Sequence, residues 1–131
     1  MQDQQQDTSI LVCQINEINL DSKMIVSIKK PQVIHMNTYD IHLLFNKINI
    51  NTVIYYVNRF QIDYLALDIP LTKYIAIARR LIDCLRKENS AIRIICTGDA
   101  ITQQIAKDIG ADGFTKDGND ITRVIEALDK K

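Results

Sequence analysis

Three polar side chains directly follow short apolar runs, and together their types could perform chemistry. Asp68, Thr97 and Lys116 each end or follow such a run, and Pro70 and Gly98 lie beside them. A carboxylate, a hydroxyl and an ammonium are the groups that surround a transferred phosphoryl group when an aspartate is the nucleophile. The same groups could instead line a crevice for another ligand. We therefore take these five positions as the core of a candidate site.

The apolar runs alternate with segments of helical periodicity, which predicts how these side chains are positioned. The expected strands are residues 9–15, 32–36, 64–67, 92–96 and a short run that ends at 114. The expected helices are residues 20–30, a helix from about 51 to 60, 72–87, one that ends before Gly110, and one from about 121 to 128. Residues 37–49 fit a loop, a short strand or a helical turn equally well.

Five strands alternating with five helices predict an α/β fold. We expect a single three-layer flavodoxin-like domain, with a five-stranded parallel sheet of order 2-1-3-4-5 and helices on both faces. The domain should span residues 9–131, after a disordered polar tail over residues 1–8. In such sheets the ligand site lies beyond the carboxyl ends of the strands, where the candidate residues fall.

Composition excludes several classes of function. The 16 Lys and Arg residues balance the 16 Asp and Glu residues, so no bulk electrostatic attraction to nucleic acid is expected. No apolar run approaches the roughly 18 residues that cross a bilayer, and the N-terminus lacks a signal-peptide pattern. We therefore expect a cytoplasmic protein that contacts no membrane. The four glycines form no phosphate-cradling loop, and no catalytic triad or zinc spacing is present.

The cysteines and histidines favour structural roles. Cys13, Cys84 and Cys96 are widely spaced among apolar neighbours, so we expect buried reduced thiols and no metal site. His35 and His42 are expected as strand or surface residues.

Two segments resemble a known family. The segment TQQIAKDIGADGF (102–114) and the helix RLIDCLR (80–86) resemble the cobalamin-binding domain of corrinoid proteins and cobalamin-dependent mutases. The resemblance covers residues 63–128 clearly and the first half of the chain weakly. It implies the flavodoxin-like fold and a cofactor crevice at the carboxyl ends of the strands.

The first ligand motif of that family is altered here. Its first loop carries Asp-x-His-x-x-Gly, whose imidazole is the lower cobalt ligand, and the matching positions are Glu17, Asn19 and Ser22. An amide is a much poorer cobalt ligand than imidazole. A serine also supplies a Cβ atom where the family has glycine. The resemblance therefore implies a crevice that includes these three residues but lacks the cobalt ligand.

The other two ligand motifs are altered as well. The Ser-x-Leu motif that lines the nucleotide tail of the cofactor is Asp68-Ile69-Pro70, and the Gly-Gly motif is Thr97-Gly98. A carboxylate at position 68 would face the phosphate-bearing tail or be buried without compensation, and either is costly. We therefore expect no cofactor, cobalamin included.

Response-regulator receiver domains are a second, weaker resemblance. Asp68 would be the phosphoacceptor, Thr97 the conserved hydroxyl and Lys116 the conserved lysine. The acid pair that seats Mg²⁺ in that family is replaced by Gln14-Ile15, which removes the metal ligands. Phosphoryl transfer should therefore be impaired on this interpretation.

Each candidate residue also has a purely structural interpretation. Asp68 could cap the turn that follows its strand, and Glu17 and Asn19 could cap the first helix. Lys116 could form a salt bridge with Asp68 or be a solvated loop residue.

A retained frame with altered ligand motifs favours a non-catalytic regulatory or protein-interaction module on a cobalamin-binding-like scaffold. Its partner would be a protein, met through the former ligand face or an exposed helix. Homodimerisation stays open. The alternatives are an atypical receiver domain and a sensor that holds heme or another small molecule in the same crevice.

Overall fold

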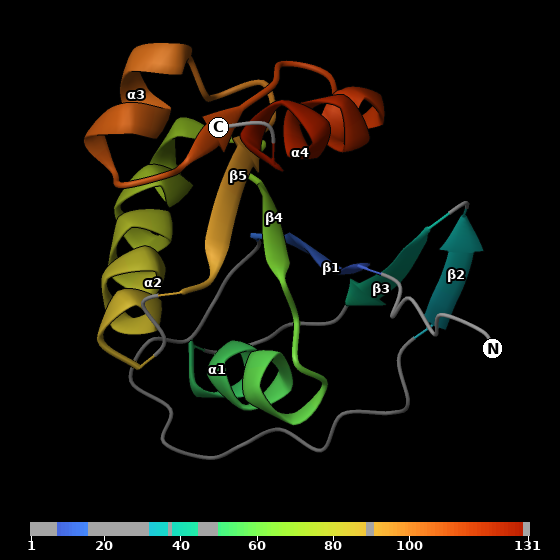
Figure 1. The fold of residues 1–131 in the computed structure, drawn as a ribbon. Coiled ribbons are helices and arrows are strands. Elements are labelled where there is room, and N and C mark those ends of the chain that lie inside the picture. Colours follow the sequence, from blue (N-terminus) through green and yellow to red (C-terminus); the bar gives the residue numbers. More distant parts are fainter. Residues whose placement is uncertain (1–7, 16–31, 37, 45–49, 89–90, 130–131) are drawn as a thin grey trace, which may run out of the picture.

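The computed structural model describes residues 8–15, 32–36, 38–44, 50–88 and 91–129. Within these ranges, six strands form one mixed sheet in the order β2-β3-β1-β4-β5-β6 (Figure 1). All neighbouring pairs are parallel except β2 and β3. The strands are β1 (Thr8–Gln14), β2 (Gln32–Met36), β3 (Tyr39–Leu44), β4 (Tyr64–Asp68), β5 (Arg93–Thr97) and β6 (Gly113–Phe114).

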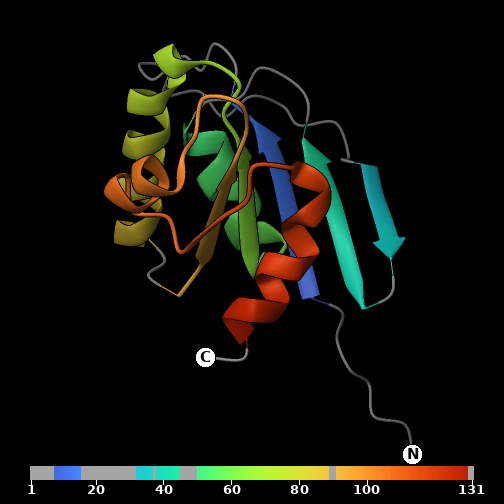
Figure 2. The same ribbon diagram turned by 90° about the horizontal axis from the view of Figure 1, so that it is seen from above.

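Four α-helices of the described ranges lie on the two faces of the sheet. They are α1 (Ile50–Arg59), α2 (Ile75–Glu88), α3 (Gln103–Asp108) and α4 (Ile121–Asp129). Short 3₁₀ turns over Thr72–Tyr74 and Gly118–Asp120 precede α2 and α4. Helices α1, α2 and α3 pack on one face, and α4 crosses the other (Figure 2). These four helices and the α/β architecture confirm the sequence expectation. The helix predicted over 20–30 lies outside the described residues.

The predicted strand count and order were wrong at one edge of the sheet. We expected residues 32–36 to be the second strand of a purely parallel sheet, but β2 is an antiparallel edge strand and β3 takes the place beside β1. Only two residues separate β2 from β3, and so short a connection permits an antiparallel hairpin but no parallel crossover. The five parallel strands, with β3 counted second, do follow the order 2-1-3-4-5.

Two apolar clusters lie on opposite faces of the sheet because side chains alternate along each strand. The larger cluster joins Leu11 and Cys13 of β1 to the buried faces of α1, α2 and α3. The smaller joins Ile10 of β1, Ala66 of β4 and Ile95 of β5 to Ile125 of α4. Alternating residues of one strand therefore serve separate cores.

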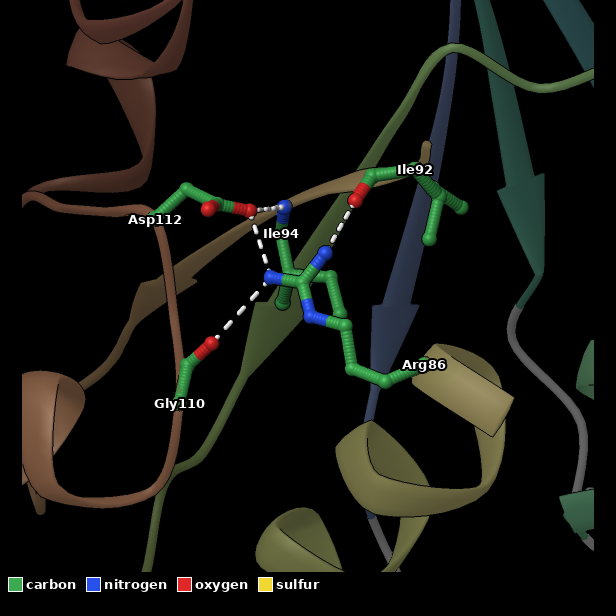
Figure 3. A network of polar contacts seen from close by, with 5 residues as sticks. All are labelled: Arg86, Ile92, Ile94, Gly110 and Asp112. Carbon is green, nitrogen blue, oxygen red and sulfur yellow. Dashed lines mark hydrogen bonds and ion pairs between the residues drawn. The ribbon is translucent and has the colours of Figure 1, made fainter. Parts of the chain in front are cut away.

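The segments that resemble the cobalamin-binding family meet at the amino end of β5 (Figure 3). Arg86 of α2 donates hydrogen bonds from its guanidinium to the carbonyl oxygens of Ile92 and Gly110. It also forms an ion pair with Asp112, with 2.6 Å between Nη2 and Oδ2. The same carboxylate oxygen accepts a 2.8 Å hydrogen bond from the Ile94 main-chain N–H. These contacts fasten the end of α2 and the α3–β6 connection to β5.

Among the helices of the described ranges, none is both long and apolar enough to cross a membrane.

Candidate functional site

A crevice of about 790 Å³ lies at the carboxyl ends of β1, β4 and β5, on the face of the sheet that α4 covers. Its polar lining includes Asp68, Thr97 and Lys116, and Ile10 and Ile121 belong to its apolar wall. This volume lies within the range of roughly 300–1,000 Å³ typical of small-molecule sites. The crevice is therefore large enough to be a binding site.

Strand register brings three polar side chains to one place. Gln14 of β1 pairs with Asp68 of β4, and Asp68 pairs with Thr97 of β5. Since the three strands are parallel, their carboxyl ends meet at one edge, and paired residues point to the same face. Asp68 and Thr97 therefore lie side by side on one face of the sheet.

The Asp68 carboxylate is held by an amide from the neighbouring strand. Gln14 donates a hydrogen bond from Nε2 to Oδ2 of Asp68 over 3.2 Å. The Asp68 side chain is half-buried, and a carboxylate can accept several hydrogen bonds. Asp68 therefore keeps the capacity to bind a further donor in the crevice.

Thr97 is almost completely buried, and its side-chain hydroxyl has no hydrogen-bond partner among the described residues. Its exposed fraction is 4%, and its Oγ1 atom contacts no partner in the part of the chain that the structure describes. Thr97 lies on the same face of β5 as Ile95, two residues earlier, which is the face of the crevice. A buried hydroxyl without a partner costs free energy, so this atom needs an explanation.

Gly98 allows the close approach of two strand ends. Its φ of 118° is a conformation that residues with a side chain rarely adopt. A Cβ atom here would lie 2.4 Å from the Ile69 carbonyl oxygen and 2.8 Å from Oδ1 of Asp68. Position 98 therefore requires glycine.

Lys116 does not form the salt bridge with Asp68 that we considered. Its Nζ donates to the carbonyl oxygens of Asp99, at 3.2 Å, and Ile101, at 3.3 Å. Lys116 therefore lies on the rim of the crevice and fastens the loop after β5. Of the phosphoacceptor set, the structure brings together Asp68 and Thr97, and it directs the ammonium of Lys116 to main-chain carbonyls.

The remaining predicted positions divide into two groups. Pro70 lines the crevice, as expected. Glu17, Asn19 and Ser22 lie outside the described residues, so their prediction stays untested. Sequence reasoning missed the apolar wall of the crevice, to which Val12 contributes beside Ile10 and Ile41. The alternation of Ile10, Val12 and Gln14 along the first strand was a signal that could have found it.

The histidines lie away from the crevice. His42, 7% exposed, is on the opposite face of the sheet, where its Nδ1 is 2.8 Å from the Tyr56 hydroxyl. Burial lowers the His42 pKa and raises the Tyr56 pKa to about 12, so burial favours the neutral form of both side chains. His35 is paired with Asp40 on the β2–β3 hairpin.

The cysteines and the acidic side chains give no sign of a metal centre in the described ranges. Cys13 and Cys96 are buried, and burial raises the pKa of each thiol to about 12. The burial of Cys13 and Cys96 agrees with the expected packing role, whereas Cys84 is only partly buried, so the expectation of three buried thiols was wrong at that position. No three His, Cys, Asp or Glu side chains of these ranges gather as metal ligands would.

No model of a known protein family matches the chain, and neither does any curated protein. Solved structures do match. A cobalamin-binding protein from Desulfitobacterium hafniense DCB-2 superposes with a TM-score of 0.68 at 13% sequence identity, over 92% of this chain and 58% of that one. The monomethylamine corrinoid protein of Methanosarcina barkeri superposes with a TM-score of 0.66 at 14% identity, over 95% of this chain and 58% of that one.

The chain has the fold of a cobalamin-binding domain. This confirms the fold expected from the segments at 80–86 and 102–114. At these identities the likeness concerns the fold alone. The chain spans 58% of the length of each of these two proteins.

The described part of the crevice fits cobalamin poorly. The resemblance assigns the nucleotide tail to positions 68–70 and 97–98, and here the Asp68 carboxylate and the Thr97 side chain line that space. The tail carries a phosphate, so the carboxylate would repel it inside a partly buried site. Gly98 is the one glycine of the Gly-Gly motif that remains, and its positive φ and the close approach of Ile69 and Asp68 already require it.

Proposed function

We propose that the chain is a non-catalytic regulatory or protein-interaction module, built on the frame of a cobalamin-binding domain, that does not bind cobalamin. One observation carries the proposal. The half-buried Asp68 carboxylate, held by Gln14, occupies the part of the crevice that the resemblance assigns to the nucleotide tail. Removing a phosphate from water to place it beside a carboxylate is strongly unfavourable.

The contrast between frame and crevice supports a role without catalysis. The contacts of Arg86 and Asp112 hold α2 and the α3–β6 connection against β5, in the part of the chain that resembles the cobalamin-binding family. Among the described residues, no group of His, Cys, Asp or Glu side chains could hold a metal ion. The ammonium of Lys116 donates hydrogen bonds to main-chain carbonyls. A module of this kind would act by changing its contact with a protein partner at the carboxyl edge of the sheet.

Cobalamin titration tests the first part of the proposal. We expect no spectral change beyond free cobalamin when the full chain is added, and no corrinoid retained after gel filtration. The Asp68→Ser variant, which restores the hydroxyl of the family, is the matched comparison. Stoichiometric uptake of cobalamin by the wild-type chain would show that the proposal is wrong.

Position-dependent crosslinking tests the second part. A photoreactive residue placed at Asp99, which is exposed at the crevice rim, should yield one discrete product with a protein partner in the native host. The same residue at Asp83, exposed on α2, is the control and should not yield that product. Identical products from both positions would contradict a partner at the crevice.

Phosphoryl acceptance at Asp68 is the second candidate function. The observation that favours it is the register pairing of Asp68 with Thr97, which puts a carboxylate and a hydroxyl together in the crevice. The engagement of Lys116 with the carbonyls of Asp99 and Ile101 is the observation against it.

A further inference from the structure

We propose that the crevice binds a small organic cation, whose primary ammonium lies between the Asp68 carboxylate and the Thr97 hydroxyl while its apolar body packs on the sheet. This inference rests on the proposed function in one respect: the crevice must not hold a corrinoid. It goes further by naming the chemistry of the occupant.

The unpartnered Thr97 hydroxyl is the first observation. Thr97 is 96% buried, judged from its 4% exposure, and strand alternation directs it to the crevice face beside Asp68. Its Oγ1 has no hydrogen-bond partner among the described residues. A ligand that supplies a donor to this oxygen would remove the cost of leaving it unsatisfied.

The charge of the lining is the second observation, and it selects a cation. Among the described lining residues, Asp68 and Asp99 place two carboxylates around the crevice, and Lys116 carries the one described ammonium. That ammonium already donates to two carbonyl oxygens. An anionic ligand would be repelled by the Asp68 carboxylate, whereas an ammonium would be attracted and could donate a hydrogen bond to it.

The apolar wall is the third observation, and it defines the rest of the ligand. Ile10, Val12 and Ile41 of the sheet and Ile121 of α4 line the crevice opposite its polar end. An ion without an apolar body, such as ammonium itself, would leave this wall in water. A ligand with one ammonium and one compact apolar group matches both ends, as is usual for small-molecule pockets.

Calorimetric titration with matched probes tests the inference. 2-Phenylethylamine should bind the wild-type chain, and 2-phenylethanol and 3-phenylpropionate, which keep the ring but lack the ammonium, should bind at least about tenfold more weakly. A further probe, N-acetyl-lysine methylamide, distinguishes an ammonium that belongs to a protein lysine from one that belongs to a free small molecule. A preference for this probe assigns the ammonium to a lysine of a protein partner, and a preference for phenylethylamine assigns it to a free small molecule.

Two variants locate the ammonium. Asp68→Asn keeps the shape of the side chain and should weaken amine binding about tenfold or more, with the alcohol unaffected. Thr97→Val should weaken it by a smaller factor. Asp83→Asn, an exposed change on the far side of the sheet, is the control. Should Asp68→Asn fail to fold, the preference of the wild type for amine over alcohol, and its loss at high salt, decide the matter.

Three results would overturn the inference: no amine binding below about 10 mM, equal binding of amine and alcohol, or no effect of Asp68→Asn in a folded protein. The proposed function fails separately, through stoichiometric uptake of cobalamin. Suppose that the chain takes up no cobalamin and that Asp68→Asn leaves the affinity for the amine unchanged. That result would contradict this inference but not the proposed function.

Discussion

At the amino end of β5, the Arg86 guanidinium and the Asp112 carboxylate contact each other and the main chain around them (Figure 3). At the carboxyl end of the same strand, the buried Thr97 hydroxyl has no partner in the described residues, and Asp68 receives one amide donor. The five residues of β5 therefore run from a satisfied polar cluster at one end to a hydroxyl without a described partner at the other. The polar groups that support the fold have hydrogen-bond partners, whereas polar groups at the crevice can still accept a hydrogen bond from a ligand.

The largest expected effect comes from Gly98, the closest backbone approach at the crevice. Gly98→Ala should lower the free energy of unfolding by about 3 kcal/mol or more, since it combines a strained positive φ with a severe steric contact at the Ile69 carbonyl. Chemical denaturation measures this.

Gly118→Ala is the matched control, because a Cβ atom there meets nothing within 4 Å. It should change the stability by no more than about 0.5 kcal/mol. Equal effects of the two substitutions would show that the strand ends do not approach as described.

The satisfied end of β5 should respond next. Arg86→Ala should cost about 2–3 kcal/mol, because it removes the guanidinium donor from two carbonyl oxygens and leaves Asp112 with only the Ile94 N–H among its described donors. The side chains of Arg86 and Asp112 are 29% and 36% exposed, so solvent limits the loss.

Arg79→Ala, an exposed change on the same helix, should stay within about 0.5 kcal/mol and is the control for charge and helix propensity. If Arg86→Ala proves as mild as Arg79→Ala, the contrast between the two ends of β5 has no energetic basis.

The unsatisfied end should respond in the opposite direction. Thr97→Val replaces a buried hydroxyl that lacks a partner and should raise the stability by about 1 kcal/mol. Thr115→Val is the matched control, since that buried hydroxyl donates to the Asp117 carbonyl over 3.1 Å and its loss should cost about 1 kcal/mol. Destabilisation by both changes, measured by denaturant unfolding, would mean that Thr97 has a partner after all.

The smallest expected effect concerns phosphoryl transfer. Incubation with acetyl phosphate and Mg²⁺ should add no phosphoryl group, because Gln14 stands where a metal-binding acid is needed and Lys116 is directed to main-chain carbonyls. Intact-mass spectrometry reads the result. A phosphorylated wild type whose label disappears in Asp68→Ala would favour the receiver interpretation instead.

Much of the fold followed from local patterns. Apolar periodicity placed β4, β5 and the helices α2 and α4, because these elements bury a continuous stripe or run. The β2–β3 hairpin at the edge of the sheet could not be predicted from these patterns. The apolar residues of 37–49 have no single period, and Asn37-Thr38 is not a typical hairpin turn sequence. For the site, Asp68, Thr97, Pro70 and Gly98 were found from their position after strands, and the partner of Lys116 was not.

Residue types and spacing alone were sufficient to establish the α/β class, the parallel pairing of the central strands and the polar positions at the strand ends, but not the antiparallel edge strand β2. They could do so because burial of alternating or helical stripes is a local property of the chain. Which groups touch depended on long-range packing: Gln14 and Asp68 are 54 residues apart, as are Ser9 and Asp63. Strand register made Asp68 the neighbour of Thr97, and packing of the loops directed Lys116 to the carbonyls of Asp99 and Ile101. In the described part of the chain, no partner reaches the Thr97 hydroxyl. Each of these outcomes depends on segments far apart in the sequence, so local patterns could not predict it.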